Sequence, residues 1–440
     1  MLRRIIALFL CVPFMVQAQS NVLHMSYQDA VALALQQNYD ILIARKNVLI
    51  ADKQNTLGNA GFLPKIDLTA TGSLSNNKTR QEFSSGLNVD QSGVKSNNIN
   101  SGAYLTWTIF DGLKMFATKE RLSLMAQQSQ LGLRLQMENT IEAVSLQYYQ
   151  IVKQEQLIKG IWASMEVSDA RIQLAEKKLA IGSGSNVEVL QAKLDRNAQA
   201  ADLILQTNLL KEYKNNLLLL CQREVGADFT VDTAFAFETL PALQEITQQT
   251  NNNNTSLLQV QKGSLIAQQS IKELRAQTLP RLGLTSNYLF TRSSNAAGFT
   301  LLNQNLGLNM GFSFSWNLFN GWTTHNQVQS AQLQYSIAQM QIAQNKAQLM
   351  SRTQVAYIRW MGDQQILAME EANIKLAEQS LNITKERLKL GLGNYLEAKE
   401  SQSTYQAALT RLVNARYNVK QSEIALQKLR GGMIKEIEQN

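Results

Sequence analysis

Few residues of this chain have the types and spacing that enzyme chemistry needs. The 440 residues include two histidines, His24 and His325, and neither has an acid or a cysteine at the spacing of a metal site. The sequence contains no Walker loop, dinucleotide fingerprint, GxSxG or HExxH motif. We therefore predict that the protein is not an enzyme and uses neither a metal nor a cofactor.

The acids that stand out follow two glycine-rich turns. Glu188 comes after the first turn, and Glu397 and Glu400 come after the second. Acids are common in the first turn of any helix because the helix dipole favours them there. If symmetry multiplies these acids around a narrow opening, they form a ring that selects cations and gates by charge. The sequence alone leaves both interpretations open.

Each glycine-rich turn belongs to a stretch that occurs twice. KLAIGSGSNVEVLQAK covers 178–193, and RLKLGLGNYLEAKESQ covers 387–402. Gly182 and Gly391 lie 209 residues apart, close to half the chain. A Gly-X-Gly pair supplies the positive φ that ends one helix, and the Ser or Asn that follows can cap the next. Each stretch therefore predicts the tip of a long helical hairpin.

The repeat extends over most of the chain. Asn38 corresponds to Asn254 and Pro64 to Pro280, and both offsets are 216 residues. Further along, the offset falls to 209, as in the pairs Gly112/Gly321 and Tyr148/Tyr357. One long repeat is thus used twice, with a loop seven residues shorter in the second copy.

Strand-like alternation begins at the two prolines. It predicts β-hairpins over about 64–110, with a polar loop near 75–98, and over about 280–318. In the second hairpin every other residue from Leu306 to Leu318 is apolar. Such strands suit a membrane β-barrel, and the alternative is a soluble hairpin with one face on a core. Because four strands are too few to close a barrel, a barrel requires several chains.

The remainder of each half is helical. Ser26 can cap a helix that continues to about Gly61, and the stretch from Leu113 to Ile181 is 69 residues long. The returning helices are expected over about 187–225 and 395–430. Part of the long helix has coiled-coil spacing, at Ile141, Val144, Tyr148, Ile151, Ile158, Trp162, Met165, Ile172 and Leu179. Polar residues on the other faces indicate helices packed side by side with one face in water.

The N-terminus has the pattern of a secretory signal peptide over residues 1–18, so export is expected. Cys221, the cysteine that remains after cleavage, is read as a small apolar residue of a helix. The net charge of +8 lacks a dense basic run, so nucleic acid is not an expected partner. The expected organisation is signal peptide 1–18, first repeat 19–225, connecting segment 226–245, second repeat 246–430 and tail 431–440.

This order of elements resembles the TolC-type outer-membrane efflux proteins (outer membrane factors). The resemblance is carried by the strand entries Gly61-Phe62-Leu63-Pro64 and Thr278-Leu279-Pro280, the FxG turns, the long helices and the glycine tips, all in two copies. It covers essentially the whole mature chain. It implies an α+β membrane protein of a Gram-negative outer membrane. In that fold a homotrimer forms a shared 12-stranded β-barrel continuous with a periplasmic α-helical coiled-coil barrel.

The resemblance also implies partners and site residues. The tips would dock a periplasmic adaptor (membrane fusion) protein and an inner-membrane transporter. The docking residues are Gly182, Ser183, Gly184, Ser185, Asn186, Gly391, Leu392, Gly393, Asn394 and Tyr395. The family's periplasmic entrance gate corresponds to Glu188, Glu397 and Glu400.

The expected function is therefore the exit duct of a tripartite efflux system for small molecules. Two alternatives are the outer-membrane duct of a type I protein-secretion system and a non-conducting periplasmic coiled-coil scaffold.

Overall fold

The structure is a computed structural model that describes residues 23–297, 300–390 and 392–434. The predicted signal peptide lies outside the described residues, as does most of the predicted tail. The chain forms two compact units. One contains the chain up to Ala34, Ala143–Phe237 and Asp363–Gln421, and the other contains Leu35–Glu142, Glu238–Gly362 and the chain from Ser422. Among the described helices, none has the length and apolar character to cross a membrane.

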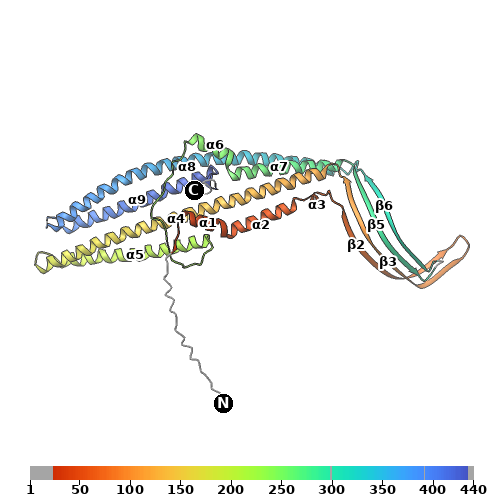
Figure 1. Cartoon of the computed structure of the whole chain (residues 1–440), viewed down its shortest axis with the longest axis horizontal. Helices are drawn as coiled ribbons and strands as arrows, with labels where there is room; N and C mark the ends of the chain where they lie inside the picture. Colours follow the sequence, from red (N-terminus) through yellow and green to blue (C-terminus); the bar gives the residue numbers. More distant parts are fainter. Residues whose placement is uncertain (1–22, 298–299, 391, 435–440) are drawn as a thin grey trace, which may run out of the picture. The chain divides into compact units, whose positions relative to one another are not determined.

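The two halves of the chain share one order of elements (Figure 1). The first half contains α1 (Tyr27–Gln37), α2 (Tyr39–Gln54), α3 (Leu57–Ala60), β2 (Lys65–Glu82), β3 (Asn88–Phe110), α4 (Lys114–Ala180) and α5 (Asn186–Leu220). The second contains α6 (Leu243–Asn253), α7 (Thr255–Arg275), the 3-10 helix η1 (Ala276–Thr278), β5 (Arg281–Asn295), β6 (Leu302–Ser315), α8 (Thr323–Lys389) and α9 (Tyr395–Leu429). Helices α4 and α8 both have 67 residues, and α5 and α9 both have 35.

Each half begins with a helix that is interrupted at an asparagine. Ser26 starts α1 as a capping box: its Oγ accepts from the Asp29 backbone N–H at 3.1 Å, and Asp29 Oδ2 accepts from the Ser26 N–H at 3.2 Å. The expected single helix to about Gly61 is wrong, because Asn38 is extended and its side chain caps α2. Asn254, the counterpart of Asn38, caps α7 in the same way. An Asn side chain that bonds a nearby N–H competes with the helix and ends it.

The four long strands form one antiparallel sheet in the order β2-β3-β5-β6 (Figure 1). The predicted polar loop over 75–98 is wrong, because β2 and β3 continue through it to a short turn around Gly86. This stretch is rich in hydroxyl and amide side chains, so it lacks the alternation of apolar residues that marks a strand. The backbone hydrogen bonds of the ladder form without that alternation. Cross-strand bonds such as that between the Ser75 and Ser96 hydroxyls, at 2.5 Å, join the two strands here.

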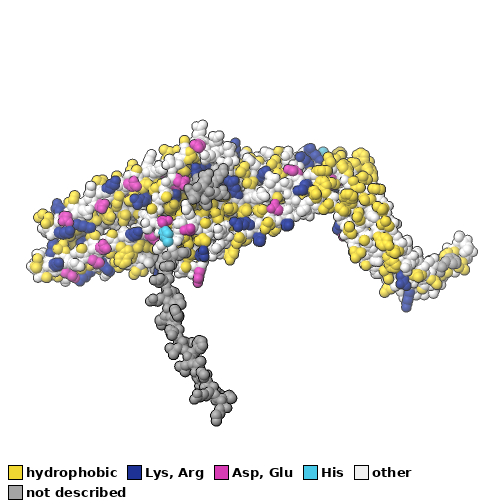
Figure 2. Space-filling model, viewed as in Figure 1, with side chains coloured by type: hydrophobic (Ala, Val, Ile, Leu, Met, Phe, Trp, Pro, Cys, Tyr) yellow, Lys and Arg dark blue, Asp and Glu magenta, His cyan; other side chains and the backbone are white. Residues whose placement is uncertain are grey.

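The register places the apolar residues of all four strands on one face. Ile66 pairs with Leu105, Trp107 pairs with Leu284, and Leu284 in turn pairs with Phe312. We call the alternate positions within 66–74, 99–107, 282–290 and 306–314 the apolar face; each stretch is nine residues long, and its exceptions are Gly72, Ser101 and Ser286. Leu68 and Phe312 are 85% and 76% exposed in the single chain. Figure 2 shows hydrophobic side chains gathered over the part of the sheet near the helices.

The base of each hairpin is held by a tryptophan. The Trp107 indole N–H donates to the Phe62 carbonyl at 2.9 Å, and the Trp316 indole N–H donates to the Thr278 carbonyl at 3.0 Å. The strand predicted from the apolar row Leu306 to Leu318 is therefore shorter than expected. Strand β6 ends at Ser315, and the Trp316 contact replaces the ladder there.

After each hairpin the chain turns sharply into a long helix. Gly112 and Leu113 both have positive φ, and so do Gly321 and Trp322 at the equivalent positions. A Cβ on Gly112 would lie 2.4 Å from the Ala276 carbonyl oxygen, so only glycine fits. The two turns fix where α4 and α8 start.

The middle of α4 contains some of the most deeply buried side chains of the first unit. Val144, Tyr148 and Ile151 of the predicted coiled-coil row are at most 1% exposed, whereas Trp162 is 54% exposed. The Tyr148 hydroxyl bonds the Met25 carbonyl and the Asp232 carboxylate. Strand β4 (Phe229–Thr230) of the connecting segment pairs in parallel with β1 (Leu23–His24). Cys221 is fully buried, as its interpretation as a small apolar residue requires.

Candidate functional site at the helical tips

The first tip is a glycine turn between α4 and α5. The Ser183 N–H donates to the Lys178 carbonyl at 2.9 Å and the Gly182 N–H donates to that of Leu179 at 3.1 Å, which is a Schellman ending. Gly182 has a φ of 75°, and a Cβ on Gly184 would lie 2.8 Å from the Lys178 Cβ. Ser185 then caps α5. The glycines are therefore required by the turn itself, and Ser183, Ser185 and Asn186 are exposed around it.

The second tip joins α8 to α9. The Leu392 and Gly393 N–H groups both donate to the Arg387 carbonyl, at 2.9 and 3.1 Å, and the Asn394 side chain accepts from the Glu397 N–H at 2.7 Å. Leu392 is 71% exposed, so the tip carries an apolar side chain on its surface. Gly391, one of the predicted docking residues, lies outside the described residues.

The three predicted gate acids lie in the helices that restart after the tips. Glu188 and Glu397 are half-buried in the first turns of α5 and α9, and Glu400 is exposed one turn later. Glu397 already has a cation beside it, because its Oε1 lies 3.5 Å from the Arg387 Nε at the end of α8. Within its own hairpin, Glu397 thus ties the start of α9 to the end of α8.

A polar cluster next to the tips connects the two hairpins. Its centre is the Asp195 carboxylate of α5, which accepts hydrogen bonds from the Tyr395 hydroxyl at 2.8 Å and the Lys399 Nζ at 2.9 Å, both from α9. Arg171 of α4 approaches the same carboxylate at 3.5 Å. Its guanidinium also lies 4.5 Å from the centroid of the Tyr395 ring, a cation–π distance. We call these four residues the Asp195 cluster.

The cluster is shielded from water, and this changes its proton affinities. The side chains of Arg171 and Asp195 are 6% and 18% exposed. Burial alone raises the pKa of the Asp195 carboxyl, but the bonds from Lys399 and Tyr395 and the charge of Arg171 outweigh it and hold that pKa below its ordinary value. Burial and the bond to Asp195 raise the pKa of Tyr395 to about 12. At neutral pH the carboxylate is therefore charged and the phenol is a donor.

Uncharged polar groups continue the connection along the helices. The Gln402 amide nitrogen of α9 donates to the Ser164 carbonyl of α4 at 2.8 Å and to the Ser168 hydroxyl at 3.1 Å. Its oxygen accepts from Arg171 at 2.7 Å. Gln199 of α5 bonds both serines, at 2.9 and 3.1 Å. Three helices from two hairpins thus share one bonded polar seam.

Sequence reasoning found only part of this arrangement. It predicted Tyr395 as a docking residue of the tip, and the structure shows that the Tyr395 hydroxyl also belongs to the Asp195 cluster. It missed Arg171, Asp195 and Lys399. The signal it could have used is the spacing of Tyr395, Lys399 and Gln402, which puts one polar stripe on one face of α9.

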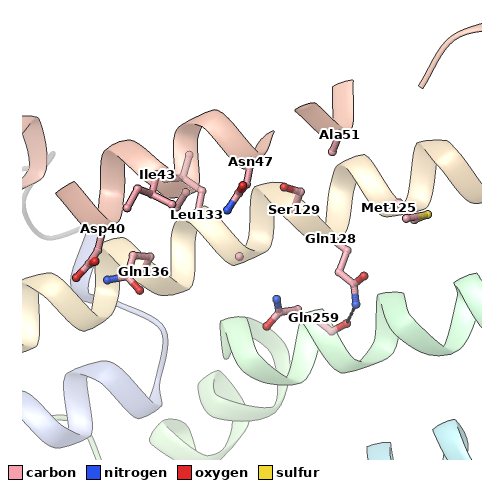
Figure 3. Close-up of a pocket in the computed structure, with 12 residues that line it drawn as sticks. Asp40, Ile43, Asn47, Ala51, Met125, Gln128, Ser129, Leu133, Gln136 and Gln259 are labelled. Carbon is pink, nitrogen blue, oxygen red and sulfur yellow. Dashed lines mark hydrogen bonds between the residues drawn. The ribbon is translucent and has the colours of Figure 1, made fainter. Parts of the chain in front are cut away.

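An open groove in the second unit has a different character. It has a volume of about 680 Å³ and lies between α2, α4 and α7 (Figure 3). Its lining includes Asp40 as the single acid, together with aliphatic side chains and amides such as Gln136 and Gln259. Across the part of the chain that the structure describes, no group of three or more His, Cys, Asp or Glu side chains could hold a metal ion.

Comparison with known proteins gives the family. Residues 30–221 and 246–432 match the family described as "Outer membrane efflux protein". The chain is 20% identical to the outer membrane protein TolC of Escherichia coli (strain K12) over 348 residues, which are 75% of this chain and 68% of TolC. It is 26% identical to the Vibrio cholerae TolC over 191 residues, 43% of this chain and 42% of that protein.

Solved structures share the fold. The Campylobacter jejuni CmeC outer membrane channel superposes with a TM-score of 0.77 at 17% identity, covering 94% of this chain and 88% of CmeC. CusC gives a TM-score of 0.77 at 17% identity, covering 92% of each chain.

The matching segments include both hairpins and both tips, so they span the whole duplicated architecture. The resemblance to TolC-type proteins and the expectation that the protein is not an enzyme are confirmed, because the matching family consists of outer-membrane channels. This chain belongs to the outer membrane efflux protein family and is an outer-membrane efflux channel.

Proposed function

We propose that three copies of this chain form one duct across the outer membrane. The four-stranded sheets join edge to edge into a 12-stranded barrel, and the helical hairpins continue the duct into the periplasm. Small molecules delivered by an inner-membrane transporter, through a periplasmic adaptor, pass outward without being chemically changed.

The exposed apolar face of the sheet carries this proposal. Its four stretches of nine residues end at nearly the same level, since their ends differ by at most two residues between paired strands. At about 3.3 Å per residue, nine residues cover about 26 Å along a strand, and strands of about 9–11 tilted residues cross a bilayer. The opposite face carries mainly Thr, Asn, Ser and Gly, as the wall of a water-filled channel does.

The edges of the sheet supply the reason for an oligomer. In the described residues β2 and β6 each have one neighbour, so the sheet has two open edges. Long unpaired edges with an apolar face are unstable in water and in lipid. Two chains would supply eight strands, about the smallest number that closes a barrel, and the twelve strands of three chains enclose a wider channel.

The tips form the gate at the periplasmic entrance of the duct and the surface that binds the adaptor. The Asp195 cluster holds α9 of the second hairpin against α4 and α5 of the first, which favours a closed entrance. Opening the entrance separates these helices and exposes the cluster to water. The adaptor binds the exposed tip residues, including Leu392, and Glu188, Glu397 and Glu400 face the entrance as an acidic ring.

Deletion in the native host tests the efflux function. Cells without this protein should become more sensitive to a panel of toxic small molecules and regain resistance with the gene restored. Unchanged sensitivity, together with loss of a secreted polypeptide from the medium, would instead indicate a type I protein-secretion duct. No change in either, with a protein that forms no channel in planar bilayers, would indicate a non-conducting scaffold.

A further inference from the structure

A cavity lies where β5 ends and the chain turns into β6, and β2 and β3 continue beyond it to Glu82 and Asn88. It has a volume of about 620 Å³ and lies among β2, β3 and β5. Its lining includes Leu74, Asn76, Lys95, Asn97 and Ser294, which all occupy the alternate positions that continue the apolar face. Half of the ten lining residues therefore belong to the row that the proposed function turns toward lipid.

The apolar face changes to polar at this level on every strand. After Leu74, Ile99, Phe290 and Leu306, the next residues on the same face are Asn76, Asn97, Arg292 and Gln304. Arg292 pairs with Ile99 on one side and with Gln304 on the other, so it lies at the border itself. Lys95 follows Asn97 on the same face. Figure 2 shows basic side chains against the far part of the sheet, beyond its hydrophobic surface.

Lys95 and Arg292 have no acidic partner among the described residues, and both are exposed. Two other basic residues, both in the hairpin of β2 and β3, do have an acidic partner. Lys78 lies 3.8 Å from Asp90, and Arg80 lies 3.1 Å from Glu82. Lys95 lines the cavity, and Arg292 lies on the same strand as its lining residue Ser294, two residues away. Exposed cations without an acidic partner, at the border between an apolar and a polar surface, can make charge-assisted bonds to an anion. Their placement therefore indicates an anionic ligand.

The position of the cavity narrows the class of ligand. Lys95 is four residues along β3 from Ile99, the partner of Arg292, so the two cations lie about 13 Å apart along the strands. A headgroup of two sugars with a phosphate at each end spans such a distance. The amides of Asn76 and Asn97 and the Ser294 hydroxyl suit sugar hydroxyl groups, and Leu74 begins the apolar surface for acyl chains.

We propose that this cavity binds a phosphorylated glycolipid of the outer leaflet, with its phosphates on Lys95 and Arg292 and its acyl chains along the apolar face. The proposal rests on the proposed function, because the sheet must cross the membrane with its far end outside. It favours a glycolipid over a phospholipid because the lining offers sugar-binding amides and a hydroxyl as well as charge.

Lipid binding to the purified, detergent-solubilised assembly tests the proposal. The probes are a synthetic acylated disaccharide with two phosphates, the same glycolipid without phosphates, and phosphatidylglycerol. Native mass spectrometry measures the bound fraction for the wild type and for the variant K95Q/R292Q. The control K346Q/R352Q removes two exposed cations from α8 and so matches the loss of charge.

We expect the wild type and the control to bind the bisphosphorylated glycolipid equally, and K95Q/R292Q to bind it at least about tenfold more weakly, since charge-assisted phosphate contacts are lost. Removing the phosphates from the probe should have a similar effect. Equal binding by K95Q/R292Q and the control would overturn the proposal. Equal or stronger binding of phosphatidylglycerol by the wild type would overturn the glycolipid assignment.

The proposed function is checked separately on the same samples. If the assembly is trimeric and conducts ions in planar bilayers but binds no glycolipid, the inference fails and the duct stands. If the chain neither assembles nor enters a bilayer, both fail, because the sheet then has no outer leaflet to face.

Discussion

The Asp195 cluster allows the proposed gate to be weakened without changing the shape of a side chain. Asp195→Asn keeps the side-chain volume and removes the negative charge that faces Arg171 and Lys399. Tyr395→Phe removes only the hydroxyl that donates to Asp195 at 2.8 Å. Both changes leave the glycine turns, the strands and the rest of the polar seam as they are.

The free-energy cost of each substitution depends on how far the lost bond is exposed to water. A hydrogen bond to a charged group contributes about 1.5–3 kcal/mol when it is shielded from water. The bond between Tyr395 and Asp195 is shielded, so Tyr395→Phe should cost the closed entrance about 2 kcal/mol, or roughly 30-fold in the closed-to-open ratio. Lys399 is 41% exposed and can turn to water, so its share is about 0–1 kcal/mol. Asp195→Asn should therefore cost about 3 kcal/mol in total, or roughly 150-fold.

Single-channel recording in planar bilayers measures this ratio directly as the fraction of time in the high-conductance state. Tyr405→Phe is the matched control, because Tyr405 is also a half-buried tyrosine of α9 and lies outside the cluster. We expect Asp195→Asn to open more than Tyr395→Phe, and Tyr405→Phe to behave as the wild type. Open fractions that are the same in all three variants would refute the role given to the cluster.

Three further predictions concern pH, the sheet and the acids. Because folding lowers the pKa of Asp195, its contribution is complete above about pH 4, the usual carboxyl pKa, and is lost as the pH falls further; acid should open the wild-type channel more steeply than the Asp195→Asn channel. Phe312→Asp, on the apolar face, should abolish membrane assembly in a heat-modifiability gel, whereas the neighbouring Ser313→Asp, on the opposite face, should retain it. Neutralising Glu397 and Glu400 should lower cation selectivity or divalent-cation block in reversal-potential measurements; unchanged values of both would contradict the acidic ring.

The sequence predicted the helices well because their signals are local. Part of α4 has the apolar spacing of a coiled coil, and no proline interrupts α4 or α8. The lengths of 67 residues agree closely with the expected 69 for the first long helix. The tips were also found from local chemistry, since Gly182 needs a positive φ that other residues rarely adopt.

The strands beyond the apolar face escaped prediction for a physical reason. From Ser75 onward β2 consists mainly of Ser, Asn, Thr and charged residues, a composition shared by loops. Its strand conformation comes from the ladder with β3, which pairs Asn77 with Val94 and Glu82 with Asn88. Pairing of this kind depends on the partner strand and leaves no periodic apolar signal in either sequence.

The Asp195 cluster was missed because its contacts are distant in the sequence. Asp195 and Tyr395 are 200 residues apart, and Arg171 comes from a third helix. Each residue alone looks like an ordinary polar position of a wet helix. Only the packing of α9 on α4 and α5 reveals that these groups are buried together.

In the proposed function three chains share one membrane-spanning duct. The most direct test is the protein mass of the detergent-extracted particle, measured by light scattering coupled to size exclusion. We predict three times the mass of one chain. A monodisperse single chain that stays in solution without detergent would contradict it, because the apolar face of the sheet would then be exposed to water with nothing to cover it.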